Sequence, residues 1–94
     1  MKPAVPRSQR PAIWADAMRL AVEIEQAVRG FSRYHKYTLG VDLRRQAALI
    51  CQLVGQAARF AHQRPRTLER LVMAVEALKT TIYLAKEVQA FASF

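Results

Sequence analysis

Hydrophobic residues recur every three or four positions along most of this chain, and this spacing constrains the fold more than any other feature. Such a period places apolar side chains on one face of an α-helix, whereas a half-buried β-strand would alternate every second residue. Breaks that contain glycine, proline and polar residues divide the pattern into long segments. We therefore predict three long helices, at residues 12–29, 39–62 and 67–91.

Individual residues set the predicted boundaries. Gly30 suits the left-handed conformation that commonly ends a helix, so the first helix is expected to stop there. Thr38 stands where an N-cap of the second helix is needed. Pro65 prevents the second helix from continuing and predicts a short turn at residues 63–66. Gly55, inside the second helix, costs roughly 1 kcal/mol relative to alanine, which makes a packing role for it plausible.

The two short connections predict an all-α fold, an up-down antiparallel helical bundle. A chain of 94 residues makes one domain, and its hydrophobic content of 52% is ample for a core. We assign this helical-bundle domain to residues 12–94. Residues 1–11 contain three of the four prolines and no acidic residue, so we expect a flexible basic N-terminal arm there.

The third predicted helix has apolar residues on two sides. Its first stripe consists of Leu68, Leu71, Val75, Leu78, Ile82 and Ala85. Its second stripe consists of Met73, Ala77, Leu84, Val88 and Phe91. A helix with two apolar sides needs neighbours on both. The first two helices can cover the first stripe, so we predict that the second stripe is an oligomer interface covered from outside this chain.

Positive charge is the strongest compositional signal. Fifteen Lys and Arg residues face seven Asp and Glu residues, which gives a net charge of +8 and a pI of about 10.6. This balance favours a polyanionic partner, most often nucleic acid, although many basic bundles bind acidic proteins. The antiparallel course would gather one basic group beside the N-terminal arm, at Arg59, Arg64, Arg66 and Arg70. It would gather the other at Arg33, Lys36, Arg44 and Arg45.

Three aromatic residues accompany the second basic group. Tyr34, His35 and Tyr37 could stack on unpaired bases. The alternative is that the tyrosines close the end of the core. We expect one of the two tyrosines in the core and leave the role of the other open.

No catalytic pattern emerges from the sequence, and we expect no enzyme activity, no cofactor and no small-molecule substrate. The chain has no glycine-rich phosphate loop and no paired-cysteine metal motif. His35 and His62 are expected at opposite ends of the bundle, so no metal site is expected. Cys51 falls at the edge of an apolar arc, as a small buried residue would. The apolar runs are too short to cross a membrane, and we expect a cytoplasmic protein.

Two segments resemble a bacterial family of helical bundles. The first comprises FSRYHKYTLG at residues 31–40 and DLRRQ at residues 42–46. The second comprises LERL at residues 68–71, AVEALK at residues 74–79 and LAKE at residues 84–87. This family contains the Avd (accessory variability determinant) proteins of diversity-generating retroelements and the proteins encoded in intervening sequences of ribosomal RNA genes. The likeness covers roughly residues 12–94.

The resemblance implies a non-catalytic accessory protein of mutagenic retrohoming. Avd-like proteins are homopentamers of four-helix protomers with a basic surface, and they bind a reverse transcriptase and its template RNA, possibly as an RNA/DNA hybrid. Arg44 and Arg45 lie inside the matching motif, so we expect them first on that surface, followed by Arg33 and Lys36. The assignment of Arg59, Arg64 and Arg66 rests on the charge distribution alone.

Two alternatives stay open within this resemblance. Family members continue into a fourth helix beyond the position of Phe94, and that helix would be expected to pack on the second stripe. The chain is therefore expected to be either a shortened member that oligomerises through this stripe or a truncated product. The functional alternative is a structural, protein-interaction bundle of the intervening-sequence type with no direct role in nucleic-acid binding.

Overall fold

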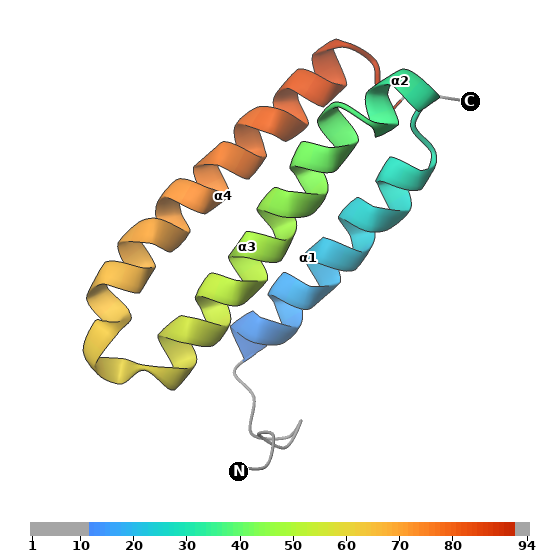
Figure 1. Cartoon of the computed structure of the whole chain (residues 1–94). Coiled ribbons are helices and arrows are strands. Elements are labelled where there is room, and N and C mark those ends of the chain that lie inside the picture. The colour runs from blue at the N-terminus through green and yellow to red at the C-terminus, as the bar shows by residue number, and fades with distance from the viewer. Residues whose placement is uncertain (1–11, 92–94) are drawn as a thin grey trace.

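The structure is a computed structural model that describes residues 12–91. Residues 1–11, where the sequence predicts a basic arm, and residues 92–94 lie outside this described part. Within it the chain is helical, and three long helices pack together (Figure 1). The elements are α1 (Ala12–Arg29), α2 (Arg33–Lys36), α3 (Leu39–Arg59), the 3-10 helix η2 (Ala61–Gln63) and α4 (Arg64–Glu87).

Helix α3 lies in the middle of the molecule. Helices α1 and α4 both pack against α3 rather than against each other (Figure 1). The largest fully buried side chains are Leu43 and Leu53 of α3 and Val28 of α1. Each such side chain contributes about 1.5–3 kcal/mol through removal of its apolar surface from water. The core therefore follows α3, and within residues 12–91 each outer helix packs mainly against this one long helix.

Helix α1 ends where the sequence predicts, but Gly30 does not end it in the predicted left-handed conformation. The helix spans Ala12–Arg29, as predicted. Gly30 does not adopt a left-handed conformation, since no described glycine has a positive φ. Instead, the Gly30 and Phe31 amides donate to the carbonyls of Ala27 and Val28, three residues back, at 3.1 and 3.0 Å. The helix thus ends by tightening its last turn, and Phe31 is turned into the core.

The corner, residues 30–38 between α1 and α3, contains a short helix that the sequence analysis missed. Helix α2 occupies four of these residues, Arg33–Lys36. Thr38 stands at the N-cap position of α3, as predicted, but its side chain makes no capping hydrogen bond. Its Oγ1 donates to the Tyr34 carbonyl at 2.9 Å and so closes the end of α2. The prediction of one tyrosine in the core is wrong, because Tyr34 and Tyr37 are both exposed.

The connection between α3 and α4 differs from the predicted turn. Helix α3 ends three residues early, at Arg59, and a 3-10 turn follows. Helix α4 begins three residues early, at Arg64, with Pro65 in its first turn. A proline is accommodated there because the first helical N–H groups need no intrahelical partner. Pro65 therefore starts α4 and does not form a separate turn.

Helix α4 ends four residues before its predicted end, in a Schellman motif. Gln89 has a φ of 61°, the Ala90 amide donates to the Ala85 carbonyl at 2.8 Å, and the Gln89 amide donates to the Lys86 carbonyl at 3.0 Å. These bonds satisfy the last helical carbonyls and reverse the chain. As a result, Phe91 packs edge-on against Phe31, with ring centroids 5.1 Å apart. Phe91 thereby closes the end of the core.

Candidate nucleic-acid interface and apolar surfaces

Two of the predicted basic residues are already engaged within the fold. The Arg44 Nε lies 2.5 Å from the Glu25 Oε2, which joins α3 to α1 by an ion pair. The Arg64 Nε donates to the Ala57 carbonyl at 2.7 Å and so ties the start of α4 to the last turns of α3. Part of the charge of Arg44 is therefore compensated, and the side chain of Arg64 is held in place.

Three predicted basic residues lie at or near the corner without such partners. Arg33 and Arg45 are exposed and Lys36 is half-buried. The ion pairs recorded among residues 12–91 do not include any of these three. Tyr34 lies beside them in α2, with its ring in edge contact with His35 at 5.4 Å between centroids. The corner thus displays positive charge together with exposed aromatic surface.

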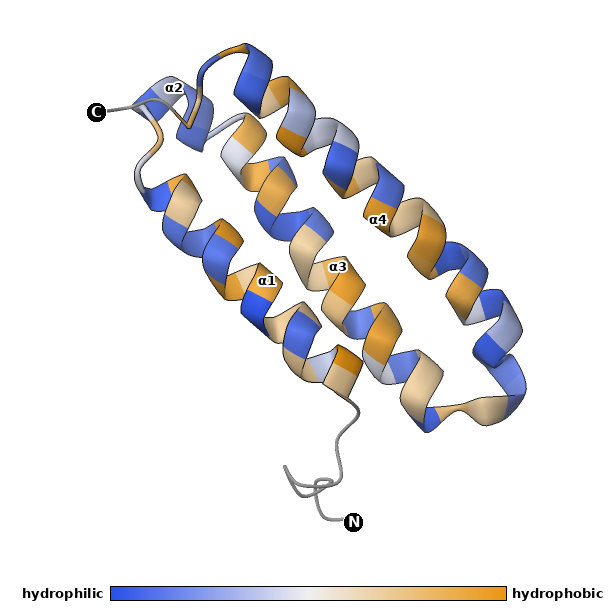
Figure 2. Cartoon of the chain, turned by 180° about the vertical axis from the view of Figure 1, so that it is seen from behind, coloured by the Kyte–Doolittle hydropathy of each residue, from blue (hydrophilic) through white to orange (hydrophobic). Residues whose placement is uncertain are grey.

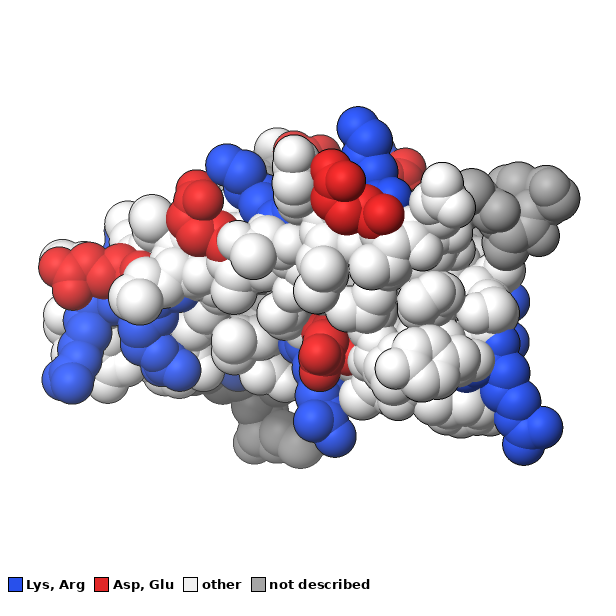
Figure 3. Space-filling view, turned by 90° about the horizontal axis from the view of Figure 1, so that it is seen from above, with Lys and Arg blue, Asp and Glu red and all other residues white. Residues whose placement is uncertain are grey.

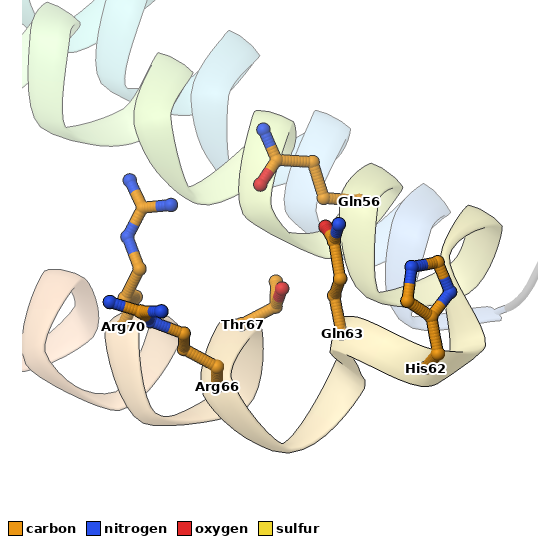
Figure 4. Close-up of a pocket in the computed structure, with 6 residues that line it drawn as sticks. All are labelled: Gln56, His62, Gln63, Arg66, Thr67 and Arg70. Carbon is orange, nitrogen blue, oxygen red and sulfur yellow. The ribbon is translucent and has the colours of Figure 1, made fainter.

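The opposite end of the molecule holds a polar pocket of about 390 Å³. We call it the turn pocket. Its lining comes from α3, η2 and α4 and consists of Gln56, His62, Gln63, Arg66, Thr67 and Arg70 (Figure 4). Arg66 was among the predicted site residues. Arg59, predicted with it, is exposed in the last turn of α3 and is not part of the lining.

The close-up shows how the lining is arranged. Arg66 and Arg70 lie on one side of Thr67, and Gln63 and His62 lie on the other (Figure 4). The Gln56 side chain reaches toward the pocket from α3 (Figure 4). Arg70 was predicted at this end but not as a site residue, and Gln56 and Thr67 were not predicted in the site. An available signal was the spacing of four between Arg66 and Arg70, which puts both on one helix face.

The Lys and Arg residues in the lining of the turn pocket are Arg66 and Arg70, and the lining contains no Asp or Glu. The first turn of α4 contains no acidic residue, and no side chain caps it. The positive end of the helix dipole is therefore uncompensated by a carboxylate. The ion pairs of the described residues involve neither Arg66 nor Arg70. An anion would find two guanidinium groups and a helix N-terminus at this position.

Four residues of the predicted oligomer stripe are exposed in this chain. Met73 of α4 is 74% exposed, and Leu84, Val88 and Ala77 are also classed as exposed. Phe91 leaves this stripe because the turn at Gln89 directs it to Phe31. Figure 2 shows hydrophobic residues on more than one side of α4. Figure 3, which shows the molecule from above, has a broad area of residues other than Lys, Arg, Asp and Glu between the charged side chains.

The other flank of α4 is also apolar and exposed, which corrects the predicted first stripe. Leu68 and Val75 were expected to be covered, but both are exposed, as are Val72 and Tyr83. The buried residues of α4 are Thr67, Ala74, Leu78 and Ala85. The buried face is turned away from Leu68 and Val75 because α4 packs on α3 without support from α1. An apolar groove of about 340 Å³ opens there, lined by Ile13, Val54, Ala57, Ala58, Arg64, Leu68 and Leu71.

Cys51 has the environment of a structural thiol. Its Sγ donates to the Ala17 carbonyl of α1 at 3.3 Å. Burial raises the pKa of the Cys51 thiol above its usual value, although the hydrogen bond opposes this rise. A raised pKa lowers the fraction of reactive thiolate at neutral pH. Gly55 has open space where a Cβ would stand, so the packing role considered for it is wrong.

Comparisons with known proteins return no match to a family model, to a curated protein or to a solved structure. None of the helices within residues 12–91 combines the length and the apolar character that a membrane span requires. In the same part of the chain, His, Cys, Asp and Glu side chains form no group of three or more that could hold a metal ion.

Proposed function

We propose that this protein is a non-catalytic, basic accessory protein that binds RNA. The observation that carries the proposal is the pair of arginines in the turn pocket, Arg66 and Arg70, which have no carboxylate partner beside an uncapped helix N-terminus. Phosphate contacts need Lys or Arg side chains that are displayed and not neutralised. The net charge of +8 supports the same partner class. The exposed Arg33 and Tyr34 of the corner provide a second candidate contact area.

Titration of a single-stranded RNA at several salt concentrations tests this proposal. Binding to phosphates releases counterions, so log K falls linearly with log salt, with a slope of about −0.7 per contact for single strands. We expect a negative slope that corresponds to several contacts. A flat plot would remove RNA binding from the account.

The resemblance of residues 31–46 and 68–87 to Avd-like proteins supports a more specific role. In that role the protein binds the reverse transcriptase of a diversity-generating retroelement together with its template RNA. Affinity capture with the products of neighbouring genes tests this role. Recovery of a reverse transcriptase with its RNA supports it, and a neighbourhood that encodes no reverse transcriptase opposes it.

A structural or protein-interaction role is the second candidate, and the exposed apolar residues of α4 favour it. Monomeric proteins rarely leave large contiguous apolar surfaces in water. We propose an up-down antiparallel bundle that associates with further copies of itself through Met73, Ala77, Leu84 and Val88. The variant Leu84→Asp places a charge in that contact and is expected to lower the mass measured by light scattering. An unchanged mass would exclude this stripe as the interface.

A further inference from the structure

Thr67 is the feature of the turn pocket that the proposed function leaves unexplained. It is a polar residue with only 5% of its surface exposed, and it lines the pocket. Its hydroxyl makes no hydrogen bond among the described residues, whereas the hydroxyls of Thr80 and Thr81 in the same helix donate to carbonyls four residues back. The buried side-chain atoms that lack a hydrogen-bond partner within residues 12–91 are His35 Nδ1 and Gln46 Oε1, so the Thr67 Oγ1 is reachable from the pocket. It can donate a hydrogen bond to a ligand that binds there.

The charged groups around Thr67 define the chemistry of that ligand. Arg66 and Arg70 are four residues apart on α4, where two like charges repel each other unless an anion lies between them. Figure 4 shows both on the same side of Thr67, opposite Gln63 and His62. Neither arginine takes part in the ion pairs recorded for residues 12–91. The pocket therefore presents donors and positive charge without a balancing carboxylate.

Size and donor geometry favour a phosphate group. The volume of about 390 Å³ falls within the range of roughly 300–1,000 Å³ typical of small-ligand pockets. Guanidinium groups bind two oxygens of a phosphate at once, and a helix N-terminus adds a favourable dipole. Thr67 can donate its O–H to a third oxygen, and the amide of Gln56 or Gln63 can donate from the rim (Figure 4).

We propose that the turn pocket is a phosphate-binding site in which Arg66, Arg70 and Thr67 hold one phosphate group of a nucleic acid. The assignment to nucleic acid rests on the proposed function, whereas the phosphate chemistry does not. The phosphate is either an internal one of the strand or the terminal 5′-phosphate. Both have the oxygens that these three side chains recognise.

The site is tested first with inorganic phosphate and the full chain, by two-dimensional amide NMR at constant ionic strength. Saturable shifts are expected at Gln63, Arg66, Thr67 and Arg70, and equal ionic strength of chloride is expected not to produce them. Thr67→Val keeps the branched shape of the side chain and replaces the hydroxyl with a methyl group. It is expected to weaken phosphate binding about tenfold, as for loss of a hydrogen bond to a charged group. Arg70→Gln is expected to weaken it more.

Arg29→Gln is the matched control, because it removes an exposed arginine of α1 that lies outside the pocket lining. It is expected to leave phosphate binding unchanged. The inference is overturned if the shifts do not saturate, if they fall outside the pocket, or if Arg29→Gln weakens binding as much as Arg70→Gln. The amide spectra of the variants themselves show that each remains folded.

RNA oligonucleotides of one sequence, with and without a 5′-phosphate, show whether the pocket binds the terminal phosphate or an internal one. A preference for the phosphorylated oligonucleotide that Thr67→Val abolishes assigns the terminal phosphate. Equal binding of both, weakened equally by Thr67→Val, assigns an internal phosphate. If RNA binding is unaffected by Thr67→Val and Arg70→Gln, the pocket is excluded while the proposed function stands. If inorganic phosphate binds at the pocket but RNA does not bind, the site stands and the proposed function fails.

Discussion

The two ends of the molecule are built in opposite ways. At the corner, Phe31 is buried against Phe91, and the start of α3 approaches α1 so closely that Gly40 leaves no room for a side chain. At the α3–α4 turn, Phe60 is 41% exposed, the polar turn pocket opens on one side and an apolar groove opens on another. The corner end is closed by its own side chains, and the turn end leaves surface available to a partner.

This difference separates stability from binding within one small domain. Residues that pack well contribute to the free energy of unfolding, whereas unpaired charges and uncapped helix ends are features that a ligand can satisfy. We therefore expect substitutions at the corner to change stability, and substitutions at the turn pocket to change binding with little effect on stability.

The same substitution at both ends gives the largest expected contrast. Phe31 is 5% exposed and Phe60 is 41% exposed. Phe31→Ala removes a buried ring and is expected to lower the free energy of unfolding by about 3–5 kcal/mol. Phe60→Ala is expected to cost less than about 1 kcal/mol, because its ring is already partly in water. Urea denaturation followed by circular dichroism measures both, and equal losses would contradict the comparison.

Two glycines of α3 provide the next contrast. A Cβ at Gly40 would lie 2.7 Å from the Val28 Cγ1 and 3.3 Å from the His35 carbonyl oxygen, and Val28 is fully buried. Gly40→Ala is therefore expected to destabilise the protein by about 1–3 kcal/mol through overpacking. Gly55→Ala meets no atom within 4 Å and is expected to stabilise it by roughly 1 kcal/mol. Thermal unfolding measures the stability of both variants. A higher Tm for Gly40→Ala than for the unchanged protein would show that α3 does not approach Val28 so closely.

Removal of one arginine at each end gives a smaller contrast. Arg44 is paired with Glu25, and each side chain is 40% exposed, so solvent screens the pair. Arg44→Gln is expected to lower stability by about 0.5 kcal/mol. Arg70→Gln is expected to leave stability unchanged or to raise it by a few tenths of a kcal/mol, because it relieves repulsion with Arg66. A double-mutant cycle with Glu25→Gln isolates the ion pair, and a coupling energy of zero would show that it contributes nothing.

The smallest effect concerns the thiol that links α3 to α1. Because burial raises the Cys51 pKa, the thiolate fraction at pH 8 is lower in the folded protein than in the unfolded chain. Alkylation by iodoacetamide is expected to be slower in buffer than in urea and to accelerate as the pH rises above the usual thiol range. Equal rates in buffer and urea at pH 8 would contradict this protected environment.

Sequence periodicity was sufficient to predict the long helices but not how α4 is oriented. The spacing of apolar residues located α1 to the residue, because one apolar face meets one neighbour. Helix α4 has apolar residues on several sides, so its pattern alone could not show that Ala74 is buried while Val75 is exposed. That choice depends on α4 packing against α3 without α1. The contact of Phe91 likewise depends on the left-handed backbone of Gln89. This conformation could not be predicted, because the position is not a glycine.

The distribution of charge along the sequence predicted a basic end at the α3–α4 turn. It could not show which arginines there bond within the fold and which line the turn pocket. Arg64 and Arg66 are two positions apart in the sequence, yet Arg64 is bonded to the Ala57 carbonyl while Arg66 lines the turn pocket. Which arginine the fold engages depends on the direction of each side chain on α4. Thr67 carries no charge and gave no sequence signal, and only its burial beside the two arginines marks it.

The most direct test of the account compares RNA binding by two charge-matched double variants as a function of salt. One variant carries Arg66→Gln with Arg70→Gln at the turn pocket, and the other carries Arg33→Gln with Lys36→Gln at the corner. We predict that the turn variant loses more affinity and that its slope of log K against log salt becomes shallower by about 1.4, the value for two lost contacts with single-stranded RNA. Retention of full affinity and slope by the turn variant, with the loss confined to the corner variant, would contradict the account.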